Sequence, residues 1–121
     1  LALGIDYALF IVQRFRAEDE AAFMALEAQF AAIEGRKGWP RGRRSRPFAG
    51  REPAHTLVWE CALPTLAAAN ELVATLGQDP DHARLLKQQI PFFLEAWTEV
   101  HEVVDFPEAR RARRGRGSRA S

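Results

Sequence analysis

Residues 55–86 read HTLVWECALPTLAAANELVATLGQDPDHARLL, and this stretch decides the fold. Its first nine residues alternate large apolar side chains with smaller or polar ones, which is typical of a β-strand. After Pro64, apolar residues recur every three or four positions, which predicts an amphipathic helix with Thr65 as its N-cap. Asp79 and Pro80 supply the N-cap and the first position of a second, short helix. We therefore expect a strand followed by a helix in two pieces.

The residues before this stretch predict a strand, a helix and an edge strand. Residues 7–16, YALFIVQRFR, are rich in β-branched and aromatic side chains and indicate a strand. The acidic run at 18–20 favours a helix start, and the apolar stripe of that helix consists of Phe23, Leu26, Phe30 and Ile33. Residues 36–53 are basic and interrupted by Gly and Pro, so we expect a loop with a short edge strand near 44–49.

The residues after this stretch complete the pattern. Pro91 interrupts the second helix, and residues 92–97 would add one further helical turn. Residues 98–105, TEVHEVVD, alternate again and predict the last strand. The order β-α-β-β-α-β indicates an α+β, ferredoxin-like fold with a four-stranded antiparallel sheet and a second helix broken into two. Residues 1–106 form this domain, and residues 107–121 are a basic, low-complexity tail that we expect to be disordered.

Composition excludes several classes of protein. A chain of 121 residues with 47% hydrophobic residues fits one domain with its own core. The single cysteine, Cys61, excludes an internal disulfide framework and fits a reducing compartment, so we expect a cytoplasmic protein. No stretch approaches the roughly 20 apolar residues of a membrane span, so we expect no membrane association. The apolar residues 1–12 include Asp6 and indicate folded structure rather than a signal peptide.

The net charge of +1 hides an uneven distribution. Residues 107–121 contain six arginines against one glutamate, and a second cluster of basic residues lies between residues 36 and 51. Arginine-rich segments can bind a phosphate backbone without reading its sequence. However, residues 1–106 are acidic overall and contain no recognition helix or aromatic RNA-binding signature. We therefore expect no nucleic-acid partner and interpret both segments as solvated charge.

Strand alternation places apolar side chains on both faces of the expected sheet. One of these sets consists of Phe10, Val12, Val58, Val100 and Val104. Helices cover only one face in this topology, and monomers rarely leave a large apolar patch in water. We therefore expect a homodimer in which two sheets pack face to face. Arg14, Glu60 and Glu102 fall on the same side and are candidates for ion pairs there.

Three segments together resemble the dimeric α/β-barrel superfamily, which includes antibiotic-biosynthesis monooxygenases, NIPSNAP-like proteins and stress-responsive barrel proteins. They are residues 7–20, 55–86 and 96–105, and the resemblance extends over about residues 5–106. It is a likeness of layout, without a short catalytic motif. The resemblance implies a paired ferredoxin-like fold and activities that range from cofactor-independent oxygenation of aromatic molecules to haem degradation and isomerisation. So many activities share this fold that the likeness selects none of them.

Four residues are candidates for a functional site: Gln13, Trp59, Trp97 and His101. Alternation predicts that all four face the helices. His101 is the candidate catalytic group, because imidazole can move a proton near neutral pH. Trp59 and Trp97 would contact a small aromatic or hydrophobic molecule, and Gln13 would orient it. The alternative is that His101 is solvated at a strand end and that the aromatic residues only pack the core.

His55 and His82 are weaker candidates, because one begins a strand beside turn residues and the other lies in the exposed first turn of a helix. The three histidines lack the i, i+4 spacing that places two ligands on one helix face, so we expect no metal and no cofactor. The leading hypothesis is a cofactor-independent, monooxygenase-like enzyme or a small-molecule binder with a pocket between sheet and helices. The alternative is a non-catalytic dimeric module for assembly or stress-related binding.

Overall fold

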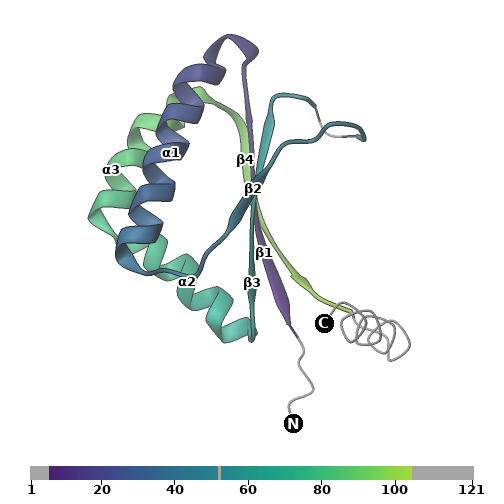
Figure 1. The fold of residues 1–121 in the computed structure, drawn as a ribbon, viewed down its shortest axis with the longest axis vertical. Helices are drawn as coiled ribbons and strands as arrows, with labels where there is room; N and C mark the ends of the chain where they lie inside the picture. Colours follow the sequence, from purple (N-terminus) through teal and green to yellow (C-terminus); the bar gives the residue numbers. More distant parts are fainter. Residues whose placement is uncertain (1–5, 52, 105–121) are drawn as a thin grey trace, which may run out of the picture.

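The computed structural model describes residues 6–51 and 53–104, which form one layer of helices on one face of a sheet (Figure 1). Its elements are β1 (Tyr7–Phe15), η1 (Ala17–Asp19), α1 (Glu20–Lys37), β2 (Arg43–Ser45), β3 (Thr56–Leu63), α2 (Leu66–Gln78), α3 (Pro80–Gln89), η2 (Ile90–Phe92) and β4 (Phe93–Glu102). The sheet order is β2-β3-β1-β4, and each neighbouring pair is antiparallel. The predicted α+β, ferredoxin-like fold with four strands is confirmed.

The predicted break in the second helix is confirmed by its caps. Thr65 Oγ1 accepts a hydrogen bond from the backbone N–H of Ala68 at 3.0 Å and starts α2. The Asp79 carboxylate accepts from the backbone N–H of His82 at 2.9 Å, and Pro80 occupies the first position of α3. Because Asp79 is extended, α3 leaves α2 in a new direction.

The core lies between the sheet and the helices. The predicted stripe of α1 is buried, and α2 contributes Ala69, Leu72 and Leu76. The α2 residues pack against Leu9, Trp59, Cys61 and Leu63, and Phe23 of α1 packs against Phe15 and Leu57. The other α1 residues of the stripe pack against Leu85 of α3. Each large apolar side chain buried in this way stabilises the fold by about 1.5–3 kcal/mol. Leu66 and Val73, two other apolar residues of α2, are exposed.

The register of β4 corrects the expected faces of the last strand. Trp97 pairs with Val12 of β1, and His101 pairs with Ala8. Residues directly opposite one another share a face, and Val12 and Ala8 point away from the helices. The prediction that Trp97 and His101 face the helices is therefore wrong. Val100 lies on the helix side instead, opposite Leu9.

Two further expectations for β4 are also corrected. The strand begins at Phe93, so the predicted helical turn over 92–97 does not form. Pro91 lies in η2, and the chain becomes extended directly after it. Glu102 pairs with Tyr7 and faces the helices, so it does not share a side with Arg14 and Glu60.

Some expectations concern residues that the structure does not describe. Residues 1–5 and the expected tail at 107–121 lie outside the described ranges. Within the described ranges, no helix has both the length and the apolar composition that crossing a bilayer requires.

Gly42 allows the chain entering β2 to pass directly over the indole of Trp59. A Cβ atom at position 42 would overlap with three atoms of the Trp59 ring. Trp59 is 5% exposed and packed in the core, so it has little room to move aside. The edge strand can therefore reach its place only with glycine at this position.

We expect Gly42→Ala to lower the free energy of unfolding by about 1–3 kcal/mol, because the new methyl group overpacks the Trp59 contact. Urea unfolding followed by tryptophan fluorescence measures the change. Gly35→Ala is the matched control, because a Cβ at position 35 of α1 meets open space. The control should be as stable as the wild type or up to about 1 kcal/mol more stable. Equal stability of the two variants would contradict the contact.

Candidate functional site

A cavity of about 350 Å³ lies between the sheet and the helices. Its apolar wall includes Ile11, Phe30, Trp59, Leu76, Leu86 and Phe93. Protein interiors are normally close-packed, and this volume is within the range of sites that hold small molecules. The cavity is therefore the leading candidate for a functional site.

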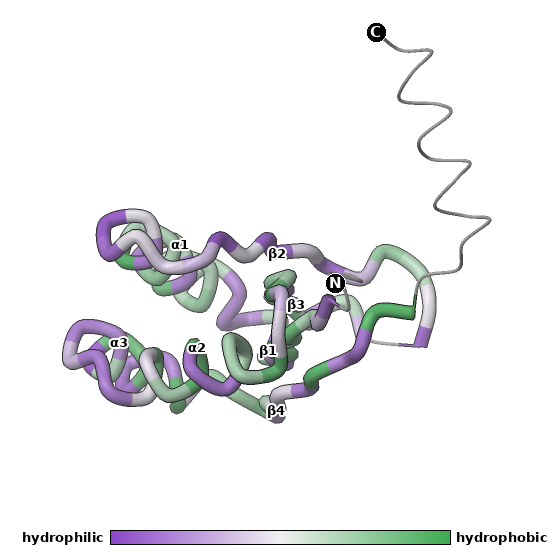
Figure 2. Tube along the Cα trace, turned by 90° about the horizontal axis from the view of Figure 1, so that it is seen from below, coloured by the Kyte–Doolittle hydropathy of each residue, from purple (hydrophilic) through white to green (hydrophobic). Residues whose placement is uncertain are grey.

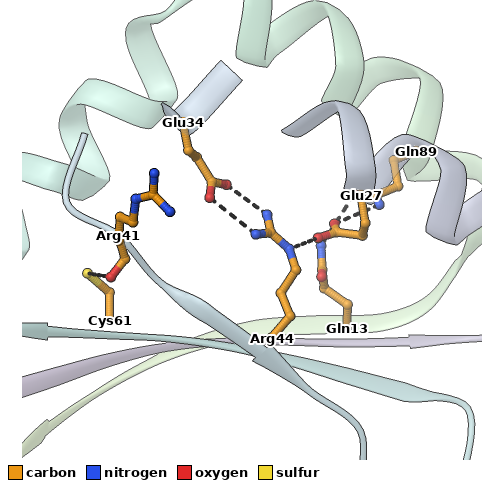
Figure 3. A network of polar contacts seen from close by, with 7 residues as sticks. All are labelled: Gln13, Glu27, Glu34, Arg41, Arg44, Cys61 and Gln89. Carbon is orange, nitrogen blue, oxygen red and sulfur yellow. Dashed lines mark hydrogen bonds and ion pairs between the residues drawn. The ribbon is translucent and has the colours of Figure 1, made fainter. Parts of the chain in front are cut away.

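One end of the cavity is polar and is built around Arg44. The register of β2 places Arg44 opposite Trp59, so its side chain points toward the helices (Figure 3). Its Nε donates a hydrogen bond to Glu27 Oε2 at 2.7 Å. Its Nη1 and Nη2 donate to the two oxygens of Glu34 at 3.2 and 2.8 Å. Glu27 and Glu34 are two turns apart on α1, so both reach the same guanidinium.

Two glutamines extend this network to α3 and β1. Gln89 Nε2 donates to Glu27 Oε1 at 2.9 Å, and Gln13 Nε2 donates to Gln89 Oε1 at 3.3 Å. Both glutamines and Glu27 are buried. Buried polar groups need such partners, because water no longer satisfies them. The polar end thus joins β2, α1, α3 and β1 through side chains alone.

Arg44 keeps its positive charge although its side chain is only 20% exposed. Burial acts to lower the pKa of Arg44, but its hydrogen bonds to Glu34 and Glu27 outweigh burial and raise the pKa above its usual value. Removing this guanidinium would leave two carboxylates facing each other in a poorly solvated space.

His82 lies in the cavity wall, so the expectation of an exposed position is wrong. Its ring packs against Phe30, with 4.8 Å between ring centroids, and lies 6.3 Å from Trp39. Burial lowers the pKa of His82 despite the nearby carboxylates of Glu34 and Asp79, which favours the neutral ring at pH 7. Its Nδ1 is buried and has no hydrogen-bond partner among the described residues.

The four residues predicted for the site are divided between the two faces of the sheet. Gln13 and Trp59 face the helices and line the cavity. Trp97 also borders the cavity, but its indole N–H donates to Glu99 Oε2 at 2.6 Å on the outer face. His101 lies on that outer face, 55% exposed, with Nε2 at 2.8 Å from Glu99 Oε1. The structure therefore does not bring His101 to the cavity.

The carboxylates of the polar end are not among the residues predicted from the sequence, although the sequence contains a signal for them. Glu27 and Glu34 follow Phe23 and Phe30 at spacings of four and fall on the apolar stripe of α1. A carboxylate inside such a stripe needs a buried partner, and only the fold reveals that this partner is Arg44.

The basic segment expected to be solvated is partly held in ion pairs. Arg43 Nη2 lies 3.3 Å from Glu60 Oε1, and Arg46 Nη1 lies 3.0 Å from Glu20 Oε1. Together with Arg44, three of its arginines therefore contact glutamates. Among the described residues, no group of three or more His, Cys, Asp and Glu side chains is placed to hold a metal ion.

No protein-family model matches the sequence, and no curated protein matches it. Solved structures do match. A NIPSNAP family protein from Agrobacterium tumefaciens superposes with a TM-score of 0.72 at 12% identity, over 88% of this chain and 92% of that one. A putative antibiotic biosynthesis monooxygenase from Nitrosomonas europaea gives 0.59 at 13% identity, over 88% and 97% of the two chains.

A third structure, SnoaB, a cofactor-independent oxygenase from Streptomyces nogalater, gives a TM-score of 0.59 at 14% identity over 84% of this chain and 96% of that one. This chain shares their fold. The expected resemblance to the NIPSNAP-like and monooxygenase-like proteins is confirmed at that level. At identities this low, structural similarity supports an inference about the fold but not about the activity.

We expect Arg44→Met to lower the free energy of unfolding by about 3 kcal/mol, because two buried carboxylates lose their shared cation. The control is Arg43→Met. Arg43 is the next residue of the same strand, but its side chain is 81% exposed and pairs with Glu60 at the surface. That variant should change stability by about 0.5 kcal/mol or less. Chemical denaturation of both variants is the measurement, and similar losses in the two would contradict a buried role for Arg44.

We expect the stability of the wild type to fall as the pH drops below the ordinary histidine pKa of about 6.5, in part through His82. The unfolded chain binds a proton on His82 in this range, whereas the folded chain resists it because its pKa is lowered. His82→Gln should therefore flatten the decline between about pH 8 and about pH 5. His55→Gln is the control, since the side chain of His55 is 45% exposed. Identical slopes for the wild type and His82→Gln would refute the assignment.

Proposed function

We propose that this protein binds a small, mainly apolar molecule in the cavity between its sheet and its helices. One observation carries the proposal: a cavity of about 350 Å³ has an apolar, largely aromatic wall and a polar end formed by Arg44, Glu27 and Glu34. Protein interiors are normally close-packed, so an apolar space of this size with a few converging polar groups is typical of a ligand site. A molecule with a polar substituent on an apolar body would fit both parts of the cavity.

The finer proposal is a monooxygenase-like enzyme. It is supported by the structural neighbour named as a cofactor-independent oxygenase, together with a neutral histidine in the cavity wall. His82 replaces His101 in this proposal as the group that accepts a proton from the bound molecule. Dioxygen would then oxidise the electron-rich anion. The alternative is a non-catalytic binding module, from which the molecule is recovered unchanged after incubation in air.

We also propose that the protein forms a homodimer through the outer face of its sheet. The helices cover only the other face (Figure 2), and Phe10, Val58 and Trp97 are partly exposed on the outer one. Charges of both signs surround them: Arg14, Arg43, Glu60, Glu95 and Glu99. A second copy related by a two-fold axis can cover the apolar residues and place arginines against glutamates.

We expect the wild type to bind 1-naphthalenemethanol and Ala96→Phe to lose most of this affinity. Ala96 is an exposed residue that lines the cavity from β4, so a phenyl ring there would occupy part of the cavity without replacing a core residue. Isothermal titration calorimetry measures both affinities. Ala22→Phe, an exposed position on α1, is the matched control and should bind as the wild type does. If the wild type binds no probe, or if Ala96→Phe binds it equally well, the proposed site is wrong.

We expect a dimer in size-exclusion chromatography with light scattering at micromolar concentration, and a monomer for Val58→Lys. The lysine would place a charge in the apolar centre of the outer face, where desolvating it is unfavourable. Leu66→Lys, at a position 47% exposed on α2, should leave the dimer intact. Thermal unfolding checks that both variants are folded. A monomeric wild type would end the dimer proposal.

A further inference from the structure

The charges that line the cavity do not balance. Among its lining residues, Glu27 and Glu34 carry two formal negative charges, and Arg44 carries one positive charge. Glu27 is 5% exposed and Glu34 is 14% exposed at the side chain, so solvent screens neither of them well. One negative charge at the polar end is therefore left without a partner of opposite sign in the cavity wall.

The guanidinium of Arg44 is already shared between the two carboxylates. Each of its three nitrogens donates one N–H to a carboxylate oxygen of Glu27 or Glu34, at 2.7–3.2 Å, and two of the five N–H groups of a guanidinium remain. The carboxylates also retain capacity, because an ionised carboxylate offers about four lone-pair sites. The contacts of Glu34 use two of these sites, and those of Glu27 use two as well. A hydrogen-bond donor can therefore still bind here.

The other cations nearby do not compensate for this charge. Lys37 Nζ lies 2.6 Å from Asp79 and 3.1 Å from Asp81, so its charge is shared between two more carboxylates. His82 faces Glu34, Glu27 and Asp79 with its pKa lowered by burial, so the neutral form is favoured at pH 7. Arg41 borders a second small hollow together with Glu34 and Arg44, but Arg41 is exposed, so solvent and salt screen its charge.

The aromatic lining of the cavity is suited to a cation as well. Phe30, Trp59 and Phe93 belong to it, and the faces of aromatic rings attract positive charge. A positively charged group therefore finds favourable partners both in the aromatic lining and at the polar end.

We propose that the molecule bound in this cavity is a monocation, an aromatic or other apolar body carrying a protonated amine, whose ammonium group contacts Glu27 and Glu34. The inference rests on the proposed function, since it concerns the same cavity. It predicts weak binding of carboxylates, phosphates and sulfates at the polar end, because such a group would meet two carboxylates against a single guanidinium.

Three probes with one aromatic body test the inference: 1-naphthylmethylamine, 1-naphthalenemethanol and 1-naphthoate. They differ in the charge of the head group, which is positive, neutral and negative near pH 7. Titration calorimetry on the full chain should show the amine binding at least about tenfold more tightly than the carboxylate at low salt. The preference should shrink as salt is added, because screening weakens the unpaired charge.

Two variants locate the source of the preference. Glu34→Gln leaves one carboxylate and one guanidinium at the polar end, so the ratio of amine to carboxylate affinity should fall toward one. Glu60→Gln is the matched control, because Glu60 pairs with Arg43 on the outer face, and it should keep the wild-type ratio. If Glu34→Gln does not fold, the ratio measured on the wild type at two salt concentrations still decides the inference.

The outcomes separate the two proposals. If the carboxylate binds as tightly as the amine, or more tightly, the inference about charge is overturned while the binding cavity stands. The same holds if the preference for the amine survives unchanged in a folded Glu34→Gln variant. If none of the three probes binds, the proposed function itself is wrong, and the inference fails with it.

Discussion

The arginine of the short edge strand, held between two carboxylates of the first helix, is the interaction on which the arrangement of the site depends. Arg44 connects β2 to Glu27 and Glu34 of α1, and Gln89 and Gln13 carry the same network to α3 and β1 (Figure 3). Buried ion pairs stabilise a fold little compared with apolar packing, because desolvation offsets most of their attraction. Stability alone therefore does not explain charged groups at the sheet–helix interface. A polar end in a cavity that is otherwise apolar does explain them, because it gives a bound molecule both a hydrophobic wall and a place for a polar group.

The same interaction shows which parts of the structure the sequence could predict. Local signals were sufficient for the elements: the alternation of β1 and β3, the caps at Thr65 and Asp79, and the break at Pro91 all correspond to what is observed. The sequence predicts that Arg44 is solvated, because a basic segment rich in Gly and Pro usually forms an exposed loop. The side chain of Arg44 points toward the helices because the register of β2 and β3 pairs Arg44 with Trp59. A shift of this register by one residue would turn the side chain to the other face.

The sequence could not predict which side chains of β4 face the helices, and the physical reason is different. The strand lies at the edge of the sheet, and most of its residues are exposed on both faces. Both alternating sets contain apolar residues, with Trp97 in one and Val100 in the other, so no burial pattern distinguishes them. The wrong choice placed His101 in the pocket and hid the importance of His82, whose position depends on how α3 packs against α1. Likeness to solved structures at 12–14% identity supports the fold, and the function has to be argued from these side chains.

The most direct test of the central claim is an NMR measurement of the arginine side-chain Nε–H groups, with Arg43 as an internal reference. A guanidinium buried between two carboxylates should give an Arg44 signal shifted away from those of exposed arginines. Its hydrogen exchange should be slow, because its Nε donates to Glu27 at 2.7 Å. Arg43, with a side chain that is 81% exposed, should exchange rapidly. If Arg44 instead has the shift and the fast exchange of Arg43, the polar end of the cavity does not exist as described.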